Sequence, residues 1–461
     1  MDLFVGRTKE LRILETIWDQ SREKNCVVYG RRRVGKSTLL RRFCENRRSI
    51  YIECIQGSIA DNIHSIARVL SGFDNNERAD HPFLEDALDD ILEVCRKEKT
   101  LVVFDELPYL LSTGRQVASI IQHFVDAMSR ETESMIIICG SSIAMMKQET
   151  TDVDRPLYGR FSTMMRIDPL SYLECSEFHP NLTYKDSVRL YLTVGGIPKY
   201  HLNMMESSYR EFIERHFLSG IADMSDEAES IISAEFAPRS RYFAIINAIA
   251  DGATSLKNIS EKSGIERRTC SRCISELESV GIIGTEKPMF GSPKNDVYRI
   301  EDPLIAFSQT VVRESRTYAL ADVSKIYDAL SFRIDSHLGH RFESLCADYV
   351  VNTRDCLEIG RWWKSDAEGT IEVDIAATVI EDGVRVSLFG ECEFRNRLTT
   401  SSVFEELVDE SRLARTDATR RYILFSASGF SDDLHELEDE GKVELVDLEK
   451  LSATWKKTGS R

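Results

Sequence analysis

The first half of the chain alternates short apolar runs with segments of helical spacing. Apolar runs at 26–29, 101–104 and 135–139 have the length of buried strands, whereas 38–43 and 186–194 have amphipathic helical periodicity. Continuous apolar strands separated by helices are typical of a parallel sheet covered on both faces. We therefore predict an α/β domain with a parallel sheet.

The pattern changes after residue 240. Helical spacing at 241–250, 256–263 and 267–280 is followed by strand-like segments at 281–284 and 297–300. Three helices and a hairpin of this size resemble a winged helix–turn–helix. Basic residues outnumber acidic ones around the turn, which favours phosphate contacts, although such domains also serve as lids or protein-docking modules. The basic residues are Lys257, Lys262, Arg267, Arg268 and Arg272.

The last third of the chain predicts a second, smaller α/β domain. Strand-like segments at 371–377 and 385–394 carry carboxylates within otherwise apolar runs. They are followed by a helix, a strand, a helix and a strand at 402–414, 422–425, 430–438 and 443–446. We expect three domains, the first α/β domain at 1–235, a winged-helix domain at 236–312 and a small α/β domain at 313–461.

Composition fits a soluble multidomain protein. A chain of 461 residues exceeds one ordinary core, and 42% hydrophobic with 29% charged residues is typical of globular proteins. We expect no membrane contact and a cytoplasmic location, because there is no long apolar run, no secretory signal, and the 11 cysteines are scattered. The net charge of −17 argues against a surface that binds nucleic acid uniformly, but leaves room for a local basic patch.

Residues 30–37 form a predicted phosphate-binding loop. The pattern G-x-x-x-x-G-K-[ST] is matched in full, between a predicted strand and a predicted helix, so a simple glycine turn is the weaker reading. Main-chain amides would surround the phosphates of ATP, Lys36 would reach the β- and γ-phosphates, and Ser37 would ligate Mg²⁺. The nucleotide-binding stretch is Gly30, Arg31, Arg32, Arg33, Val34, Gly35, Lys36, Ser37 and Thr38.

Two carboxylates follow the apolar run at 101–104. Asp105 would hold Mg²⁺ and Glu106 would polarise the attacking water, the alternative being an exposed acidic turn. Ser141 and Ser142 end the next strand, where they could sense the γ-phosphate or cap a helix. Arg160 is a candidate to meet the transferred phosphoryl group, in its own subunit or in a neighbour's site, and a surface arginine otherwise.

These motifs, in this order, resemble the archaeal-type ATPases, a branch of the AAA+/STAND P-loop ATPases. The resemblance covers about residues 1–235 and includes Phe-Val-Gly-Arg at 4–7 and Gly-Gly-Ile-Pro-Lys-Tyr at 195–200. It implies a P-loop ATPase domain with a helical lid at 1–235, in which Val5, Gly6 and Arg7 lie near the adenine and Pro198 closes over the base from the lid. The residues alone indicate only a turn after helix 186–194.

The C-terminal segment resembles the restriction-endonuclease-like (PD-(D/E)XK) fold, and also a domain often joined to archaeal-type ATPases. The resemblance implies that Glu343, Asp374 and Glu391 bind a metal ion. Glu393 stands where the nuclease family has lysine, and Arg395 is close by in sequence. An active nuclease, an inactive or DNA-binding relative, and a buried ion-pair network are the three alternatives.

Together these patterns predict a cytoplasmic ATPase that uses ATP and Mg²⁺. Its cycle would control a DNA-binding or nuclease-like effector domain. The alternatives are an ATP-switched regulator that binds DNA without cutting it and a signalling scaffold that touches no nucleic acid. DNA through the last two domains, and a second copy of the chain, are the expected partners.

Overall fold

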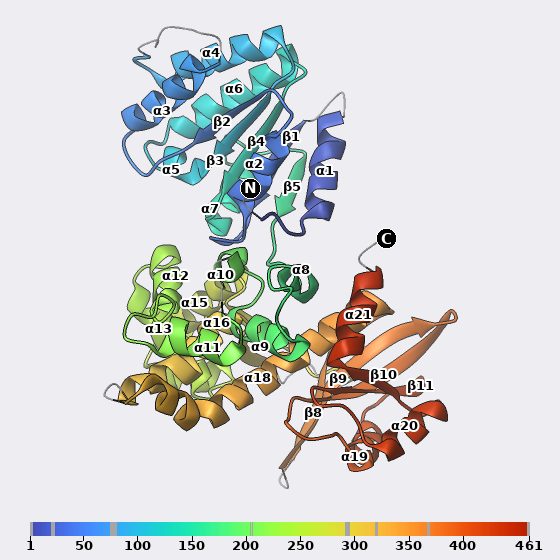
Figure 1. Ribbon diagram of the computed structural model, residues 1–461. Helices are drawn as coiled ribbons and strands as arrows, with labels where there is room; N and C mark the ends of the chain where they lie inside the picture. The colour runs from blue at the N-terminus through green and yellow to red at the C-terminus, as the bar shows by residue number, and fades with distance from the viewer. Residues whose placement is uncertain are drawn as a thin grey trace. The chain divides into compact units, whose positions relative to one another are not determined.

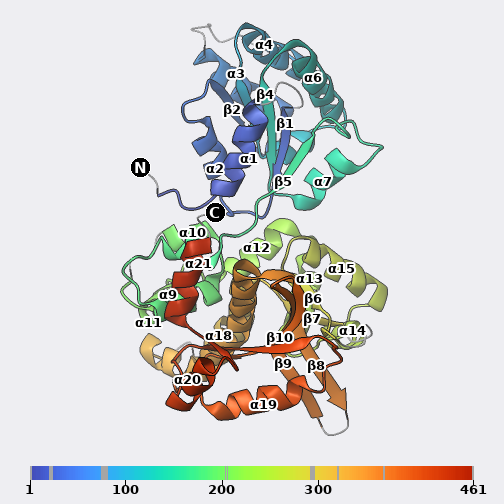
Figure 2. The ribbon, with the colours of Figure 1, turned by 90° about the vertical axis from the view of Figure 1, so that its right-hand side faces the viewer.

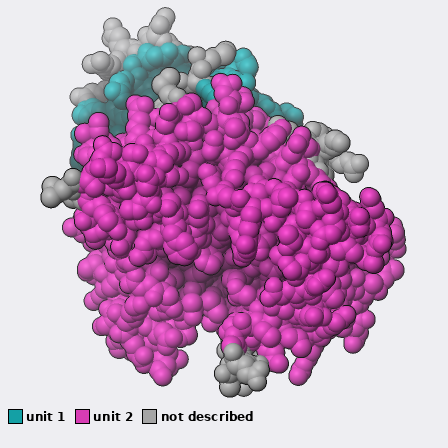
Figure 3. Space-filling model, turned by 60° about the horizontal axis from the view of Figure 1, so that its bottom comes forward, with its two compact units in different colours: residues 1–170, 197–202 teal, residues 171–196, 203–461 magenta. Residues whose placement is uncertain are grey.

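The computed structural model describes residues 3–19, 24–73, 81–202, 204, 206–290, 296–318, 321–366 and 369–458. The chain forms two compact units (Figures 1 and 3). Unit 1 consists of residues 1–170 and 197–202, and unit 2 of residues 171–196 and 203–461. The expected domain boundaries at 235/236 and 312/313 both fall within unit 2.

Unit 1 is built on a five-stranded parallel sheet with the order β2-β3-β4-β1-β5 (Figure 1). The predicted α/β fold with a parallel sheet is thus confirmed. The strands are β1 (Asn25–Tyr29), β2 (Ser49–Glu53), β3 (Leu101–Asp105), β4 (Met135–Gly140) and β5 (Thr163–Arg166). Every residue of β1, β3 and β4 is buried, which explains their uninterrupted apolar runs.

Helices flank this sheet because each has one apolar face. Helix α4 buries Leu84, Leu88 and Ile91, and α3 begins with a capping box formed by Ser58 and Asp61. The helices of unit 1 up to residue 151 are α1 (Thr8–Asp19), α2 (Lys36–Cys44), α3 (Ile59–Ser71), α4 (Leu84–Lys97), α5 (Leu107–Leu111), α6 (Val117–Glu131) and α7 (Ile143–Thr151). Short α10 (Pro198–Leu202) also belongs to this unit.

Unit 2 begins with a helical segment. It contains α8 (Tyr172–Ser176), α9 (Tyr184–Val194), α11 (Tyr209–Ile213), π-helix η1 (Glu214–Leu218) and α12 (Glu227–Glu235). The expected three helices and hairpin follow as α13 (Arg239–Ala250), α14 (Leu256–Ser263), α15 (Arg267–Ser279), β6 (Ile283–Glu286) and β7 (Val297–Ile300), with β6 antiparallel to β7. We call residues 239–300 the helix–hairpin module.

A long helix connects this module to the C-terminal sheet. After α16 (Pro303–Phe307), π-helix η2 (Ser308–Val312), α17 (Arg313–Ser315) and 3-10 helix η3 (Arg316–Tyr318) comes α18 (Val323–Thr353). Figures 1 and 2 show α18 running from the helical part of unit 2 to the sheet. One side of α18 is buried along its whole length, at residues such as Ile326, Leu338 and Phe342.

The C-terminal sheet is mixed, with the order β12-β11-β10-β9-β8. Strands β8, β9 and β10 are antiparallel neighbours, whereas β10, β11 and β12 are parallel. The elements are β8 (Asp355–Asp366), β9 (Gly369–Glu381), β10 (Val384–Glu393), α19 (Ser401–Ser411), β11 (Thr419–Ser426), α20 (Asp432–Asp439), β12 (Glu444–Asp447) and α21 (Leu448–Thr458). A further α/β region therefore follows the ATPase-like sheet, as predicted.

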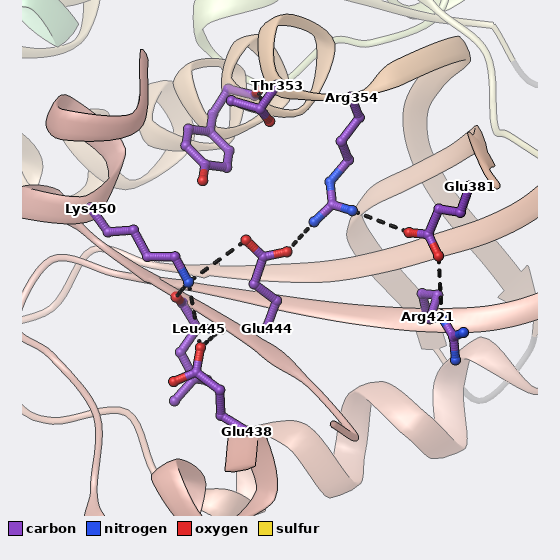
Figure 4. A network of polar contacts seen from close by, with 9 residues as sticks. Thr353, Arg354, Glu381, Arg421, Glu438, Glu444, Leu445 and Lys450 are labelled. Carbon is purple, nitrogen blue, oxygen red and sulfur yellow. Dashed lines mark hydrogen bonds and ion pairs between the residues drawn. The ribbon is translucent and has the colours of Figure 1, made fainter. Parts of the chain in front are cut away.

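One end of this sheet is tied to α18 by a chain of ion pairs (Figure 4). Arg354, which follows α18 directly, contacts Glu444 on β12 and Glu381 on β9, the latter at 3.3 Å. Glu381 also pairs with Arg421 at 3.3 Å, and Lys450 lies 3.7 Å from Glu444. Alternating charges thus connect the end of the long helix to three strands.

Within the described residues, none of the helices combines the length and apolar character that crossing a lipid bilayer requires.

Candidate functional site

The phosphate loop connects the end of β1 to the start of α2. Gly30 is required because a β-carbon there would lie 2.4 Å from the carbonyl oxygen of Ile167. Gly35 adopts φ +93°, a left-handed conformation that side chains disfavour. The two glycines let the main chain turn closely ahead of the helix, where amide groups and the helix dipole attract an anion.

Lys36 is held over this loop. Its Nζ donates to the carbonyl oxygens of Gly30 and Arg31, both at 2.9 Å, and to Ser141 Oγ at 2.8 Å. Ser141 follows β4, which lies between β1 and β3 in the sheet. The hydroxyl of Ser141 therefore lies between the strand that precedes the loop and the strand that ends in carboxylates.

Glu106 reaches the same serine from the other side. Its carboxylate accepts hydrogen bonds from the Ser141 amide at 3.1 Å and from the Ser141 hydroxyl. Glu106 has φ +53°, an uncommon conformation for a side chain this large, of the kind that clusters at functional sites. Lys36, Ser141 and Glu106 form one connected group at the carboxyl edge of the sheet.

Asp105 is the buried acid beside this group. It is 2% exposed, and its Oδ2 accepts a 2.5 Å hydrogen bond from the hydroxyl of Tyr51 on the neighbouring strand β2. Burial, followed by the charge of Asp105, raises the pKa of Tyr51, so the phenol remains a donor. A carboxylate at the strand end and the Ser37 hydroxyl at the helix start are hard oxygen ligands, which suit Mg²⁺.

The expected adenine-side residues lie against the loop. Arg7, in a left-handed conformation at φ +61°, donates from Nη2 to the carbonyl oxygen of Val34 at 2.8 Å and pairs with Glu10 at 3.0 Å. On the other side, a β-carbon on Gly35 would lie 3.7 Å from Cγ of Pro198. The structure therefore brings Arg7 and Pro198 together at the loop, with Val5 buried and Gly6 at φ +66° beside them.

The other loop residues vary in exposure. Arg32 is exposed and donates to the hydroxyl of Tyr109 at 3.0 Å, whereas Arg33 adopts φ +67°. Arg31 and Ser37 are half-buried, and Thr38 is exposed.

Arg160 lies away from this group. Asn25, the first residue of β1, donates to the carbonyl oxygen of Arg160 at 3.0 Å, and the guanidinium pairs with Asp126 at 3.3 Å. Lys36 follows the other end of β1, and a strand of five residues spans about 16 Å. Arg160 is therefore not placed to meet a phosphate bound at the loop of its own chain.

The three predicted C-terminal acids share one neighbourhood. The register of β9 and β10, with Ile375 opposite Gly390, brings Asp374 opposite Glu391, and Asp374 Oδ2 accepts from the Cys392 amide at 3.1 Å. Burial and then repulsion from Glu343 raise the pKa of Asp374, whereas burial and then repulsion from Asp374 raise that of Glu391. Two such neighbouring buried acids favour sharing a proton when no cation lies between them.

Glu343, the third of these acids, is paired with basic side chains. It contacts Arg361 Nε at 3.3 Å and His340 at 3.5 Å, and Arg361 also pairs with Glu372 at 2.9 Å. Among the residues that the structure describes, no group of three or more His, Cys, Asp or Glu side chains is arranged to hold a metal ion. Glu393, at the position expected for lysine, is paired with Arg395 at 2.7 Å.

Sequence reasoning missed one residue of the ATPase site, Tyr51. Tyr51 lies on β2, whose apolar and polar residues alternate, so the strand itself was detectable. Its contact with Asp105 depends on the order of strands in the sheet, which the sequence does not reveal. Ser141 was considered, but its simultaneous contacts with Lys36 and Glu106 appear only in the structure.

Comparison with known families supports this description. Residues 4–204 match the family described as "ATPase domain predominantly from Archaea", and residues 307–403 match one described as "Archaea bacterial proteins of unknown function". An uncharacterized protein of Methanocaldococcus jannaschii is 27% identical over 98% of this chain and all of its own length. An uncharacterized ATP-binding protein of the same organism is 44% identical over 46 residues, 10% of this chain and 78% of that protein.

Solved structures include a similar fold. A Walker-type ATPase of Pyrococcus abyssi superposes with a TM-score of 0.54 and 20% identity, over 66% of this chain and 96% of its own. The phosphate loop, the carboxylates after β3 and the two family matches lead to one conclusion. Residues 4–204 form an archaeal-type P-loop ATPase domain, and residues 307–403 match the domain of unknown function found in archaeal and bacterial proteins.

Proposed function

We propose that the protein hydrolyses ATP with Mg²⁺ and uses the cycle to change the conformation of a nucleic-acid-binding effector region in unit 2. The observation that carries the hydrolytic part is the Lys36–Ser141–Glu106 group with the buried Asp105 beside it. These residues supply the phosphate contact, the metal ligand and the base that P-loop hydrolysis requires.

Each residue has a role in this proposal. Lys36 would exchange its loop carbonyl and Ser141 contacts for the β- and γ-phosphates. Asp105 and Ser37 would hold Mg²⁺, which neutralises charge on the phosphates when bound. Glu106, released from Ser141, would orient and deprotonate the attacking water, while Ser141 would meet the γ-phosphate. Val5, Gly6, Arg7 and Pro198 would enclose the adenine.

Two substitutions test the hydrolytic part. Lys36→Ala should abolish ATP binding, because it removes the cation that compensates the triphosphate. Glu106→Gln should keep ATP binding and lose turnover, because the amide retains hydrogen bonds but cannot accept a proton. Calorimetric titration with ATP and a phosphate-release assay measure both quantities. A hydrolysis rate unchanged in either variant would refute the proposal.

The effector part is supported by the helix–hairpin module. Its exposed basic residues include Arg267 and Arg268 at the start of α15, and Glu266 is occupied in capping that helix. Phosphate contacts by such residues make binding depend steeply on salt. Fluorescence anisotropy with a DNA duplex at several salt concentrations tests this part, and salt-independent or absent binding would leave the signalling scaffold as the better candidate.

The surroundings of the C-terminal acids favour the alternative in which this domain binds nucleic acid without cutting it. Glu393 cannot supply the positive charge of the missing lysine, and Arg395 is already paired with Glu393.

In this proposal Arg160 would act only toward a neighbouring copy of the chain. Measuring ATPase activity against protein concentration tests that role, because an arginine supplied by a neighbour makes the specific activity rise as copies associate.

A further inference from the structure

A cavity of about 480 Å³ lies wholly within unit 2, where the helix–hairpin module meets α18. Its wall combines the end of α13, the hairpin strands, η2, α18 and β8. It is separate from the phosphate loop, which belongs to unit 1. The volume falls in the range of small-molecule binding sites, roughly 300–1,000 Å³.

The ionisable residues of the wall are predominantly basic. Four guanidinium groups and two imidazoles face two carboxylates. They are Arg299, Arg333, Arg341, Arg361, His337 and His340, against Glu286 and Glu343.

Two of the arginines are already neutralised. Arg299 pairs with Glu286 and with Glu301, each at 2.7 Å, and Arg361 is held by Glu343 and Glu372. These ion pairs fix the walls of the cavity.

Arg341 differs from them. Its Nη1 donates to the carbonyl oxygen of Glu301 at 3.0 Å and its Nη2 to that of Ile300. In the part of the chain that the structure describes, no carboxylate lies within ion-pair distance of Arg341. Its burial lowers the pKa of the guanidinium, which reflects the cost of a charge away from water. The ion pair of Arg333 with Glu314 is long, at 3.7 Å, so a second cation on the same helix is weakly compensated.

Most of the remaining wall is apolar. Ile249, Val297 and Phe332 contribute hydrocarbon and aromatic surface, and Thr310 comes from π-helix η2. Such irregular helical turns are frequent at functional sites. A guanidinium binds phosphate oxygens through paired N–H groups, and an apolar wall accommodates a ring.

We propose that this cavity binds a phosphorylated small molecule of mononucleotide size, with its phosphate at Arg341 and Arg333 and its ring on the apolar wall. The bound molecule would bridge the hairpin and α18, and so fix the helix–hairpin module against the C-terminal sheet. The proposal does not depend on hydrolysis at the phosphate loop.

The test uses the full chain with Lys36→Ala, so that the phosphate loop does not contribute. Calorimetric titration with pyrophosphate and with the mono- and diphosphates of the four common ribonucleosides should reveal one site per chain. Adding Arg341→Met should weaken that binding at least about tenfold, because a charge-assisted contact is lost. Arg316→Met is the matched control, since Arg316 pairs with Asp226 and Glu229 in the same unit outside the cavity wall.

A second variant distinguishes loss of the binding site from misfolding caused by Arg341→Met. Ala250→Phe places bulk in the cavity without removing a hydrogen bond, and should weaken binding as strongly as Arg341→Met. A duplex oligonucleotide is titrated in parallel, because its backbone phosphates have the same chemistry. The proposal is overturned if none of the small ligands binds, if binding survives in both Arg341→Met and Ala250→Phe, or if only the duplex binds.

Discussion

At the scale of single residues, the hydroxyl of Tyr51 should control how Asp105 binds Mg²⁺. The 2.5 Å hydrogen bond fixes the carboxylate, and the Arg41 guanidinium lies 4.4 Å from the centre of the Tyr51 ring. Tyr51→Phe should raise the Mg²⁺ concentration for half-maximal ATPase activity about tenfold, because a charge-assisted hydrogen bond is lost. The KM for ATP should change little. Tyr422→Phe, in unit 2, is the control, and an unchanged Mg²⁺ dependence would contradict this role.

His337 should make unit 2 sensitive to acid. Burial lowers its pKa to about 3, and its Nε2 contacts the carbonyl oxygen of Leu192 at 3.1 Å. The unfolded chain binds a proton near pH 6.5 and the folded chain does not, so this contribution is complete above pH 6.5 and falls below it. At pH 5 the free energy of unfolding should be about 2 kcal/mol lower than at pH 7.5. Urea titrations at both pH values measure this, and a His337→Gln variant with the same pH difference would exclude the residue as the cause.

Much of the ATPase site could be predicted from the sequence, because several of its residues are neighbours in short sequence motifs. Gly30, Gly35 and Lys36 belong to one loop, and Asp105 directly follows its strand. Arg160 could not be placed in this way. Arg160 lies beside Asn25, at the end of β1 opposite to the phosphate loop. No local sequence pattern specifies which end of β1 the chain approaches after Tyr158.

At the scale of elements, the apolar runs predicted β1, β3 and β4, but β2, β5 and β8 were missed. In β8 the buried Trp362 is surrounded by charged and polar residues, and bulges interrupt the register with β9, so no regular alternation is visible in the sequence. The sequence order of the C-terminal helices and strands was predictable. That Glu343 would pair with Arg361 of β8 was not, because the strand itself was not expected.

The link between α18 and the C-terminal sheet should contribute measurably to stability (Figure 4). Arg354→Met would leave Glu381 and Glu444 without their shared cation, and the side chain of Arg354 is 19% exposed. We expect a loss of about 1–2 kcal/mol in the free energy of unfolding. Arg412→Met, which removes an exposed pair with Asp409, should cost less than about 0.5 kcal/mol. Equal losses in the two variants would mean that the network adds nothing beyond a surface ion pair.

At the scale of the whole molecule, we expect no cleavage of DNA. Plasmid incubated with the protein, Mg²⁺ or Mn²⁺, with and without ATP, should remain supercoiled, because Glu393 replaces the expected lysine and the nearby Arg395 is paired with it. Nicking that disappears in Asp374→Ala would show that the domain is an active nuclease.

The path of the chain also limits how the protein can be divided. Residues 197–202, which include Pro198, belong to unit 1, although the residues on both sides of them belong to unit 2. A fragment that ends at residue 170 would therefore lack Pro198, which we propose encloses the adenine, and a fragment that starts at residue 171 would carry Pro198 apart from the rest of its unit. Helix α9 of unit 2 ends at Val194, four residues before Pro198, so the proposed movement of Pro198 with nucleotide would have a short covalent path into unit 2. In the proposed function, this short link would carry the effect of nucleotide from one unit to the other.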